Sequence, residues 1–358
     1  MRLLPPRREG PRYSFPPPPG SRLWRPSSPA WVGERVRALA APLIARARAA
    51  GVPGAHTPVA GTEPLPPATV AAERLRVLTL NVRGGLGPSG RRASRERLDA
   101  LAATITAHRP DVALLQEVDD FALRSGFHDQ LAELGGATAA AASAWAGVPR
   151  GVTGRGQGVM LMSFGPAIDA VRNLILPDPN GDGFARRAVR HVGAAAEYLA
   201  AHGRIPRLPI DPARPRNALE AVIVTAAGNA VRVLCVHLSW GPMHPRQVEA
   251  LASAVGAAAG PAVVAGDFNT GSATAEGREE AERVAAIGLA DAFSAAGLGP
   301  GDPARRTFGT PARRDLDRIY YASRHFSVEA ARVSEGDRSS DHRPVIADLA
   351  LGPREQAE

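Results

Sequence analysis

Short apolar runs alternate with amphipathic segments between residues 73 and 352 of this chain. Runs of four to eight apolar residues predict buried strands, and apolar positions that recur every three or four residues predict helices. Strands are expected over residues 75–80, 111–115, 158–162, 218–225, 231–238, 262–265, 317–321 and 342–349. Helices are expected over residues 94–108, with Ser94 as the N-cap, and over residues 127–134, 184–202, 245–258 and 276–287.

The connections between these elements indicate the fold class. Residues 226–229 read Ala-Ala-Gly-Asn between two apolar runs, which is a hairpin signal, so the flanking strands are expected to be antiparallel. Other strands are separated by helices, as in the crossover connections of parallel strands. The pattern therefore predicts an α/β protein in which two mixed sheets pack together with helices outside them.

The first 70 residues differ in composition from the rest. They hold 15 of the 33 prolines and a net charge of +7, which predicts extended, weakly structured chain. Residues 31–50 have mostly helical apolar spacing with arginines elsewhere. They could form a basic amphipathic helix for an anionic surface, a helix docked on the body, or a segment upstream of the natural start. Residues 165–216 are predicted to be an insertion in a domain spanning residues 71–352, and residues 353–358 a tail.

Charge and composition argue against several classes of protein. Residues 71–358 carry only +1 of the net charge of +8, which argues against extended, non-specific nucleic-acid binding. All 43 basic residues are arginine, as in GC-rich bacterial coding sequences, so arginine content is discounted as a nucleic-acid signal. Cys235 is the single cysteine, which excludes an intrachain disulfide and a thiolate metal cluster. No stretch has the ~18 apolar residues of a membrane span or the pattern of a secretory signal, so a cytoplasmic protein is expected.

Polar side chains lie at the ends of six predicted segments. Asn81, Glu117 and Asp267 follow their apolar runs, whereas Asp317 and His342 precede theirs. Strands that run antiparallel to their neighbours would bring all of these ends to one edge, where α/β sheets bind ligands. The expected set is Asn81, Glu117, His237, Asp267, Asn269, Asp317, Asp341 and His342.

This set has a plain structural interpretation and a chemical one. Taken singly, the residues could be turn formers, solvated carboxylates, a core histidine, or an ion-pair partner of Arg313 or Arg318. Together they supply carboxylates, amides and imidazoles, and such oxygen-rich sets suit Mg²⁺ or Mn²⁺ better than zinc. A histidine beside an aspartate can act as a base or, when protonated, stabilise negative charge. The set suits in-line attack of water on phosphorus.

The order of the motifs resembles a known family. The chain reads LTLN at residues 78–81, LLQE at 114–117, VHLS at 236–239 with RQ at 246–247, GDFN at 266–269, DRI at 317–319 and SDH at 340–342. Over roughly residues 73–352 this closely resembles the endonuclease/exonuclease/phosphatase superfamily with the deoxyribonuclease I-like fold. The resemblance implies a four-layer α/β sandwich and metal-dependent hydrolysis of a phosphoester, which we expect to be a phosphodiester.

The resemblance also implies roles for individual residues. Glu117 would be the main ligand of Mg²⁺ or Mn²⁺, with Asn81 beside it and Asp341 near the metal. The catalytic roles fall on five residues: Asp267 to orient or deprotonate water, Asn269 to bind the phosphate, His237 and His342 to stabilise its charge, and Asp317 to orient His342.

Some features depart from the family pattern and leave the substrate open. Arg318 stands where a tyrosine is often found, no carboxylate partner for His237 is evident, and residues 165–216 are long. Nucleic acid, a small phosphodiester and a phospholipid head group all fit as substrates. The protein is expected to be a monomer, and its basic N-terminal extension to contact an anionic surface. The alternatives are a phosphomonoesterase of the same superfamily and a catalytically silent binding protein on this fold. A silent protein predicts a lost metal glutamate or histidine, and every such position here is filled.

Overall fold

The structure is a computed structural model that describes residues 73–88, 93–120, 125, 128–147, 156–177, 216–256 and 260–352. The extension at residues 1–70, the helices expected at 31–50 and 184–202, and the tail at 353–358 lie outside the described residues. Among the described helices, none is both long enough and apolar enough to cross a membrane.

Twelve strands of the described chain form two six-stranded mixed sheets. The first sheet has the order β11-β12-β1-β2-β4-β3, with β1 (Glu73–Asn81), β2 (Val112–Asp120), β3 (Ala142–Gly147), β4 (Gly156–Ser163), β11 (Phe326–Val333) and β12 (Val345–Leu351). The second has the order β5-β6-β7-β8-β10-β9, with β5 (Ala167–Ile175), β6 (Asn217–Val224), β7 (Ala230–His237), β8 (Ala262–Asp267), β9 (Leu289–Asp291) and β10 (Asp317–Ala322).

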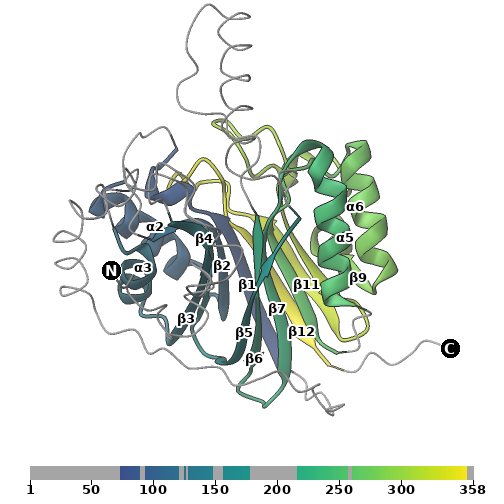
Figure 1. Cartoon of the computed structure of the whole chain (residues 1–358), viewed down its shortest axis with the longest axis horizontal. Coiled ribbons are helices and arrows are strands. Elements are labelled where there is room, and N and C mark those ends of the chain that lie inside the picture. The colour runs from purple at the N-terminus through teal and green to yellow at the C-terminus, as the bar shows by residue number, and fades with distance from the viewer. Residues whose placement is uncertain are drawn as a thin grey trace, which may run out of the picture.

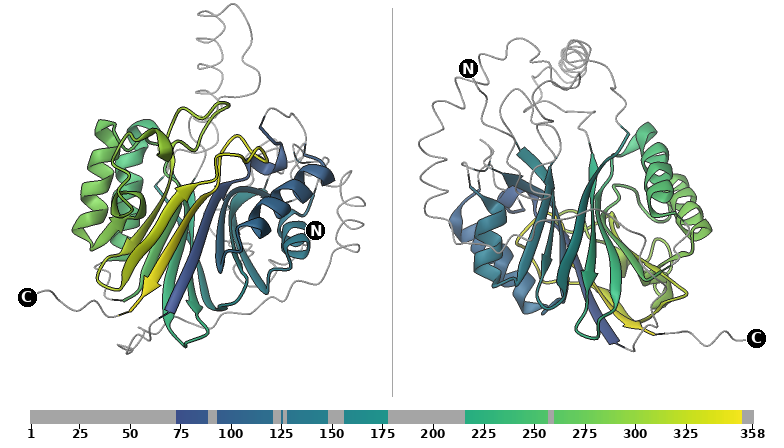
Figure 2. Two further views of the ribbon diagram at one scale, coloured as in Figure 1. Left: turned by 180° about the vertical axis from the view of Figure 1, so that it is seen from behind. Right: turned by 60° about the horizontal axis from the view of Figure 1, so that its bottom comes forward.

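Helices cover the outer faces of both sheets. Helices α2 (Arg95–Ala107) and α3 (Gln130–Thr138) lie outside the first sheet, and α5 (His244–Val255) and α6 (Ala275–Ala286) lie outside the second (Figure 1). The two sheets face each other between these helix layers (Figure 2). Short helices complete the described part: η2 (Arg83–Gly85), η4 (Gly241–Met243), α7 (Ala292–Ala295) and η5 (Pro303–Arg305). The four-layer α/β sandwich expected from the sequence is confirmed.

The apolar strands read as continuous runs because both of their faces are covered. In β1, Leu75 and Val77 belong to the core between the sheets, whereas Leu78 and Leu80 pack with α2 and α3. Successive side chains of a strand point to opposite faces, so the odd-numbered residues of β1 face the second sheet. Cys235 lies in the inter-sheet core, where burial raises the pKa of its thiol to about 12, as expected of a structural cysteine.

The beginning of the segment predicted to be an insertion, residues 165–216, belongs to the second sheet. Residues 167–175 form β5, an edge strand that pairs antiparallel with β6. Asp169 and Arg172 of this strand are exposed, and such polar side chains break the apolar run that predicts a strand. Strands β3, β9 and β11 were not predicted either, since β3 is rich in alanine, β9 has three residues and β11 carries Glu329 and Arg332 on an edge.

Candidate active site

Three of the predicted residues lie in one row across the second sheet. His237 ends β7 and pairs in parallel register with Asp267, which ends β8. Asp317 begins β10 and pairs in antiparallel register with the same Asp267. The expectation that the DRI and SDH segments precede antiparallel strands is confirmed, because β10 is antiparallel to β8 and β12 is antiparallel to β1.

The Asp267 carboxylate is the centre of the site and is 2% exposed. Its Oδ1 accepts a hydrogen bond from the Asn269 backbone N–H at 2.9 Å, and its Oδ2 accepts one from Asn81 Nδ2 at 3.0 Å. The Nε2 atoms of His237 and His342 lie 3.4 Å and 3.8 Å from the same Oδ2. The Asn81 contact joins the two sheets, since Asn81 lies on the inter-sheet face of β1.

The GDFN turn is shaped by its own residues. Gly266 has φ 154°, and a Cβ there would lie 1.9 Å from the Val236 carbonyl oxygen, so only glycine fits. Asn269 is in the left-handed region with φ 57°, where asparagine is enriched. Its side-chain Nδ2 donates to the Leu238 carbonyl at 2.8 Å. Together with the Asp267–Asn269 bond, which forms an Asx-turn, these contacts fix the turn.

His342 forms an ion pair with Asp317. The Nδ1 atom lies 2.7 Å from Asp317 Oδ2, both side chains are buried, and the Phe308 ring lies against the imidazole with a centroid distance of 4.8 Å. Burial alone would lower the pKa of His342, but the carboxylates of Asp317 and Asp267 outweigh it and raise the pKa to about 10. His342 is therefore an imidazolium at neutral pH. The pairing of Asp317 with Arg313 or Arg318, left open by the sequence, does not occur.

His237 has the opposite environment. Arg216 Nη1 lies 3.0 Å from its Nδ1, so the partner at Nδ1 is a cation, whereas the Asp267 carboxylate lies at Nε2. Burial and the Arg216 charge lower the pKa of His237 to about 3, although Asp267 acts in the other direction. One histidine of the site is thus neutral and the other is charged.

Glu117 reaches the site through a bulge in β2. The register between β2 and β4 shifts between Gln116 and Val118, so Glu117 is an extra residue, and its φ of 58° lies in the left-handed region. Such strained backbone is typical of functional positions. Its Oε1 lies 3.5 Å from Asn81 Nδ2 and its Oε2 accepts from Gln157 Nε2 at 2.8 Å.

Asp341 lies at the same edge but is paired with a cation. Arg83 Nε lies 3.2 Å from Asp341 Oδ2. Burial raises the pKa of Asp341, and the Glu117 charge adds to the rise, although His342 and Arg83 oppose it. The neighbouring Ser340 hydroxyl donates to the Asn81 backbone carbonyl at 2.7 Å and so ties the SDH segment to the end of β1.

Two sets of side chains have the chemistry to hold a divalent cation. Asp267, Asp317 and His342 have ligand atoms within 4.8 Å of one another. Within this set the Asp317–His342 ion pair occupies Nδ1, and a protonated imidazole has no lone pair for a metal. Glu117 and Asn81 instead offer a carboxylate and an amide oxygen, the ligands that hard cations prefer. The Asn81 Oδ1 accepts one hydrogen bond, from the Arg83 N–H at 2.9 Å, which leaves it a second lone pair.

A buried polar network supports the GDFN turn from behind. Arg318, which departs from the family pattern, points away from the site and pairs with Glu280 of α6 at 2.5 Å. It also donates to Thr270 Oγ1 at 3.2 Å, and Tyr320 donates its hydroxyl to Glu280 at 2.7 Å. Because these groups are almost fully buried, losing one partner would leave a charge unpaired at high cost. Arg318 is thus a support of the turn that carries Asn269.

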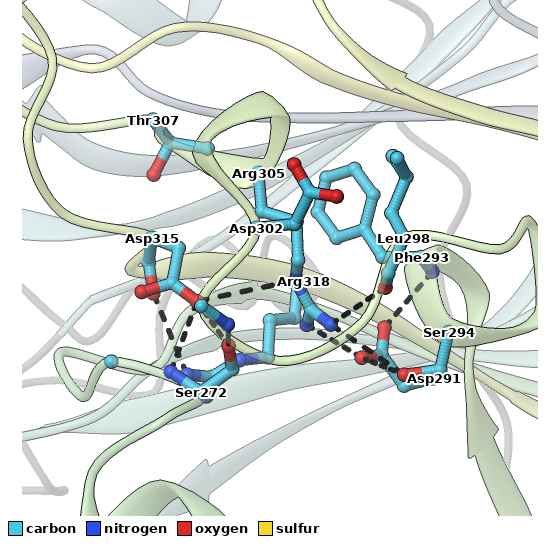
Figure 3. Close-up of polar contacts among 12 residues, drawn as sticks. Ser272, Asp291, Phe293, Ser294, Leu298, Asp302, Arg305, Thr307, Asp315 and Arg318 are labelled. Atoms are coloured by element: carbon cyan, nitrogen blue, oxygen red, sulfur yellow. Dashed lines mark hydrogen bonds and ion pairs between the residues drawn. The ribbon is translucent and has the colours of Figure 1, made fainter.

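A second cluster anchors the segment that leads to Asp317 (Figure 3). Arg305 is buried, pairs with Asp291 Oδ2 at 2.6 Å and stacks over Phe293 with its Cζ 5.0 Å from the ring centroid. Asp315 accepts from the Ser272 backbone N–H at 3.0 Å. The Asp315 contact ties the loop before β10 to the loop after β8, and the Arg305 contacts tie the same loop to β9 and α7.

All eight residues expected from the sequence lie at this edge of the two sheets. Sequence analysis missed several residues that contact them, among them Gln157, Arg216, Arg83 and Ser340. Gln157 follows a glycine-rich approach and Arg216 closes a proline-rich segment, so neither carried a strand-end signal. Arg83 and Ser340 lie close in sequence to the predicted site residues Asn81 and Asp341. This proximity was the only sign in the sequence that they contact the site. No carboxylate partner of His237 was evident from the sequence, and the structure places Arg216 at its Nδ1 and Asp267 at its Nε2.

Two mixed sheets packed face to face between helices, with acidic, amide and histidine side chains where strand ends converge, define a deoxyribonuclease I-like α/β sandwich. The model of the Endonuclease/Exonuclease/phosphatase family matches residues 78–342, and the chain belongs to this family. The superfamily comprises metal-dependent phosphoesterases, among them nucleases and phosphatases.

Solved structures share the fold. An endonuclease/exonuclease/phosphatase from Beutenbergia cavernae is 23% identical with a TM-score of 0.59, and the match covers 78% of this chain and 72% of that one. A family member from Bacteroides vulgatus is 19% identical with a TM-score of 0.53, covering 78% and 99%. The human Nocturnin catalytic domain with a bound sulfate anion is 18% identical with a TM-score of 0.52, covering 78% and 97%. Comparison with curated proteins finds no match.

Proposed function

We propose that this protein is a divalent-metal-dependent hydrolase that cleaves a phosphodiester by in-line attack of water. The observation that carries the proposal is the arrangement around Asp267, whose Oδ2 is approached by Asn81, by neutral His237 and by protonated His342. A carboxylate held this way can orient water. The three side chains around it can donate hydrogen bonds to an anionic phosphate group when one is bound. A purely structural aspartate would not need two histidines in opposite protonation states.

Asp267 is the residue that orients the water and accepts its proton. Its Oδ1 is fixed by the Asn269 N–H, so the carboxylate cannot rotate freely, and Oδ2, which accepts from Asn81, has a further lone pair for water. An amide nitrogen has two hydrogens, and the bond from Asn269 Nδ2 to Leu238 uses one. The other is available to a phosphate oxygen, which fits the expected role of Asn269.

The two histidines divide the work on the phosphate. His342 is an imidazolium held by Asp317, so it stabilises the charge that develops on phosphate oxygens or on the leaving oxygen. His237 is neutral and supplies a hydrogen bond without adding a second positive charge next to His342. This places a strong cation on one side of the phosphate and a neutral donor on the other.

Glu117 and Asn81 would hold the divalent cation, Mg²⁺ or Mn²⁺, with Asp341 near it. When bound, such a cation supplies Lewis-acid stabilisation of phosphoryl charge. The Gln157 bond to Glu117 orients the carboxylate, and the Arg83 bond to Asn81 directs the amide oxygen. Arg83 also neutralises part of the charge of Asp341.

The proposal is tested by assaying the full chain with Mg²⁺ or Mn²⁺ on bis-(p-nitrophenyl) phosphate, p-nitrophenyl phosphate and plasmid DNA. We expect cleavage of the diester or the plasmid. EDTA should abolish this activity, and restoring the metal should recover it. His342→Ala should abolish activity in the presence of the metal. His128→Ala is the matched control, because His128 pairs with Glu133 of α3. Cleavage of the monoester alone would replace the proposal by a phosphatase. Inactivity on all three, without metal binding, would replace it by a silent binding protein.

The alkaline limb of the pH profile is expected to depend on Asp317. With the pKa of His342 raised to about 10, kcat/KM should not fall through loss of its proton below pH 9. Asp317→Asn removes a neighbouring charge and a charge-assisted hydrogen bond that raise this pKa. The fall should therefore move toward neutral pH.

The measurement is kcat/KM at saturating metal from pH 6 to about pH 9, below the range in which metal hydroxides form. Asp315→Asn is the control, because this carboxylate binds Ser272 rather than a histidine. Its profile should match that of the wild type. Superimposable profiles of Asp317→Asn and the wild type would contradict the role given to the pair.

A further inference from the structure

Arg216 is fixed at the edge of the site by the sheet itself. It directly precedes β6, which pairs antiparallel with β7 so that Ala218 lies opposite Val236. Its backbone carbonyl accepts from the Leu176 N–H at 2.9 Å, which binds it to the end of β5 on the other side. The guanidinium reaches across to His237, and its Nη1 lies 3.0 Å from Nδ1.

The chemistry of this contact determines where the imidazole proton lies. A guanidinium has only donors, so an Arg216 N–H donates and the Nδ1 of His237 must accept with a lone pair. The proton of the neutral ring is then on Nε2, the atom that lies 3.4 Å from Asp267 Oδ2. The opposite tautomer would set an N–H against an N–H at Nδ1 and two lone pairs against each other at Nε2.

His342 shows the effect of a carboxylate, rather than a guanidinium, as the partner at Nδ1. There a carboxylate accepts from Nδ1, which stabilises the charged ring. Both Nε2 atoms lie within 4 Å of the same Asp267 oxygen, so two imidazolium ions there would repel each other. A cation beside His237 and an anion beside His342 avoid this conflict.

We propose that Arg216 is a positioning residue that fixes His237 as the neutral tautomer protonated on Nε2, so that His237 presents a hydrogen-bond donor to the phosphate. The inference deepens the proposed function and rests on it for the phosphate. The tautomer rests on the Arg216 contact alone. It assigns a role in this site to a residue outside all of the motifs of the sequence.

The test is ¹⁵N NMR of the full chain with labelled histidine, with the His237 signals assigned by their loss in His237→Gln. The wild type is expected to show an unprotonated, hydrogen-bonded Nδ1 and a protonated Nε2 at neutral pH. Arg216→Met keeps a long apolar stem but no donor, so the Nδ1-protonated tautomer should become populated. Arg216→Glu should place a proton on Nδ1, and Arg216→Lys should largely restore the wild-type pattern.

The activity assay gives the second measurement. Arg216→Met is expected to lower kcat about tenfold, the effect of losing roughly one well-placed hydrogen bond, with most of the loss recovered in Arg216→Lys. A merely structural role would lower stability without moving the tautomer and would not be rescued by lysine.

The outcomes separate the two proposals. A wild-type His237 protonated on Nδ1, or an unchanged tautomer in Arg216→Met, would overturn the positioning role, and the first of these needs no variant to fold. If Arg216→Met does not fold, Arg216→Lys, whose ammonium group has only donors, is expected to retain the tautomer, and a proton on Nδ1 there would overturn the role. Absence of hydrolysis with the expected tautomer in place would overturn the proposed function and, with it, the phosphate contact, while the tautomer assignment would stand.

Discussion

Asp267→Asn is expected to lower kcat for phosphodiester hydrolysis about 10³-fold, within the range that a general base contributes. The carboxylate accepts from Asn81 and faces the Nε2 atoms of both histidines. An amide cannot take a proton from water. Whichever way it is oriented, its NH₂ group would also face a hydrogen-bond donor, either the Asn269 N–H or the Asn81 amide.

The same substitution should reduce stability, because a buried donor without an acceptor costs about 1–3 kcal/mol. Asp291→Asn is the matched control for that effect. Asp291 also accepts a backbone N–H, from Phe293 at 3.0 Å, and pairs with a buried arginine, but it lies on β9. We expect Asp291→Asn to lower the thermal midpoint while kcat stays unchanged.

The measurement is kcat at saturating metal together with thermal unfolding of both variants. Mn²⁺ binding to Asp267→Asn, followed by calorimetry, should be retained, because the cation is assigned to Glu117 and Asn81. If Asp267→Asn kept more than about a tenth of the wild-type kcat, Asp267 would not be the base.

Glu117→Gln is expected to weaken Mn²⁺ binding by more than about 100-fold, beyond the roughly 10–100-fold that outer-shell changes cost. The carboxylate is the charged ligand of the expected set, and an amide of the same shape supplies one neutral oxygen. Activity should fall with the affinity and be partly recovered at high metal concentration.

Two further variants make this experiment discriminating. Gln157→Leu removes the 2.8 Å hydrogen bond to Glu117 without removing the ligand, so it should weaken Mn²⁺ binding by about 10–100-fold. Asp317→Asn belongs to the alternative set of Asp267, Asp317 and His342 and should leave Mn²⁺ affinity unchanged. Full-strength binding by Glu117→Gln with weak binding by Asp317→Asn would move the cation to that alternative set.

The protonation states of the two histidines show how one site can hold like side chains in different roles. Both imidazoles are buried and close to Asp267, and burial acts against the charged form of each. The partner at Nδ1 makes the difference: a carboxylate for His342 and a guanidinium for His237. Phosphate chemistry gains from this asymmetry, because one strong cation and one neutral donor can face the same group.

Several features of the site are encoded locally and could be predicted from the sequence. The apolar runs that end in Asn81, Glu117 and Asp267 predict their strands by their continuity and short length, since both faces of each strand are covered. The GDFN turn follows from short-range contacts, namely the need for glycine at position 266 and the bond from the Asn269 N–H to the preceding aspartate. Edge strands such as β5 and β11 could not be predicted in this way, because polar residues on their open faces interrupt the pattern.

The sequence by itself therefore determined the layered α/β architecture, the turn chemistry and the residues that gather at the strand ends, because periodicity and short-range hydrogen bonds act within a few residues. Apart from the Asp317–His342 pair, which the family resemblance implied, only the tertiary structure decided which distant residues become partners. The Asn81–Asp267 bond spans the two sheets, and Arg216 reaches His237 because β6 and β7 are neighbours. The charge of each histidine follows from its long-range neighbours and from burial. Neither the neighbours nor the burial can be read from the histidine itself or from its position in the sequence.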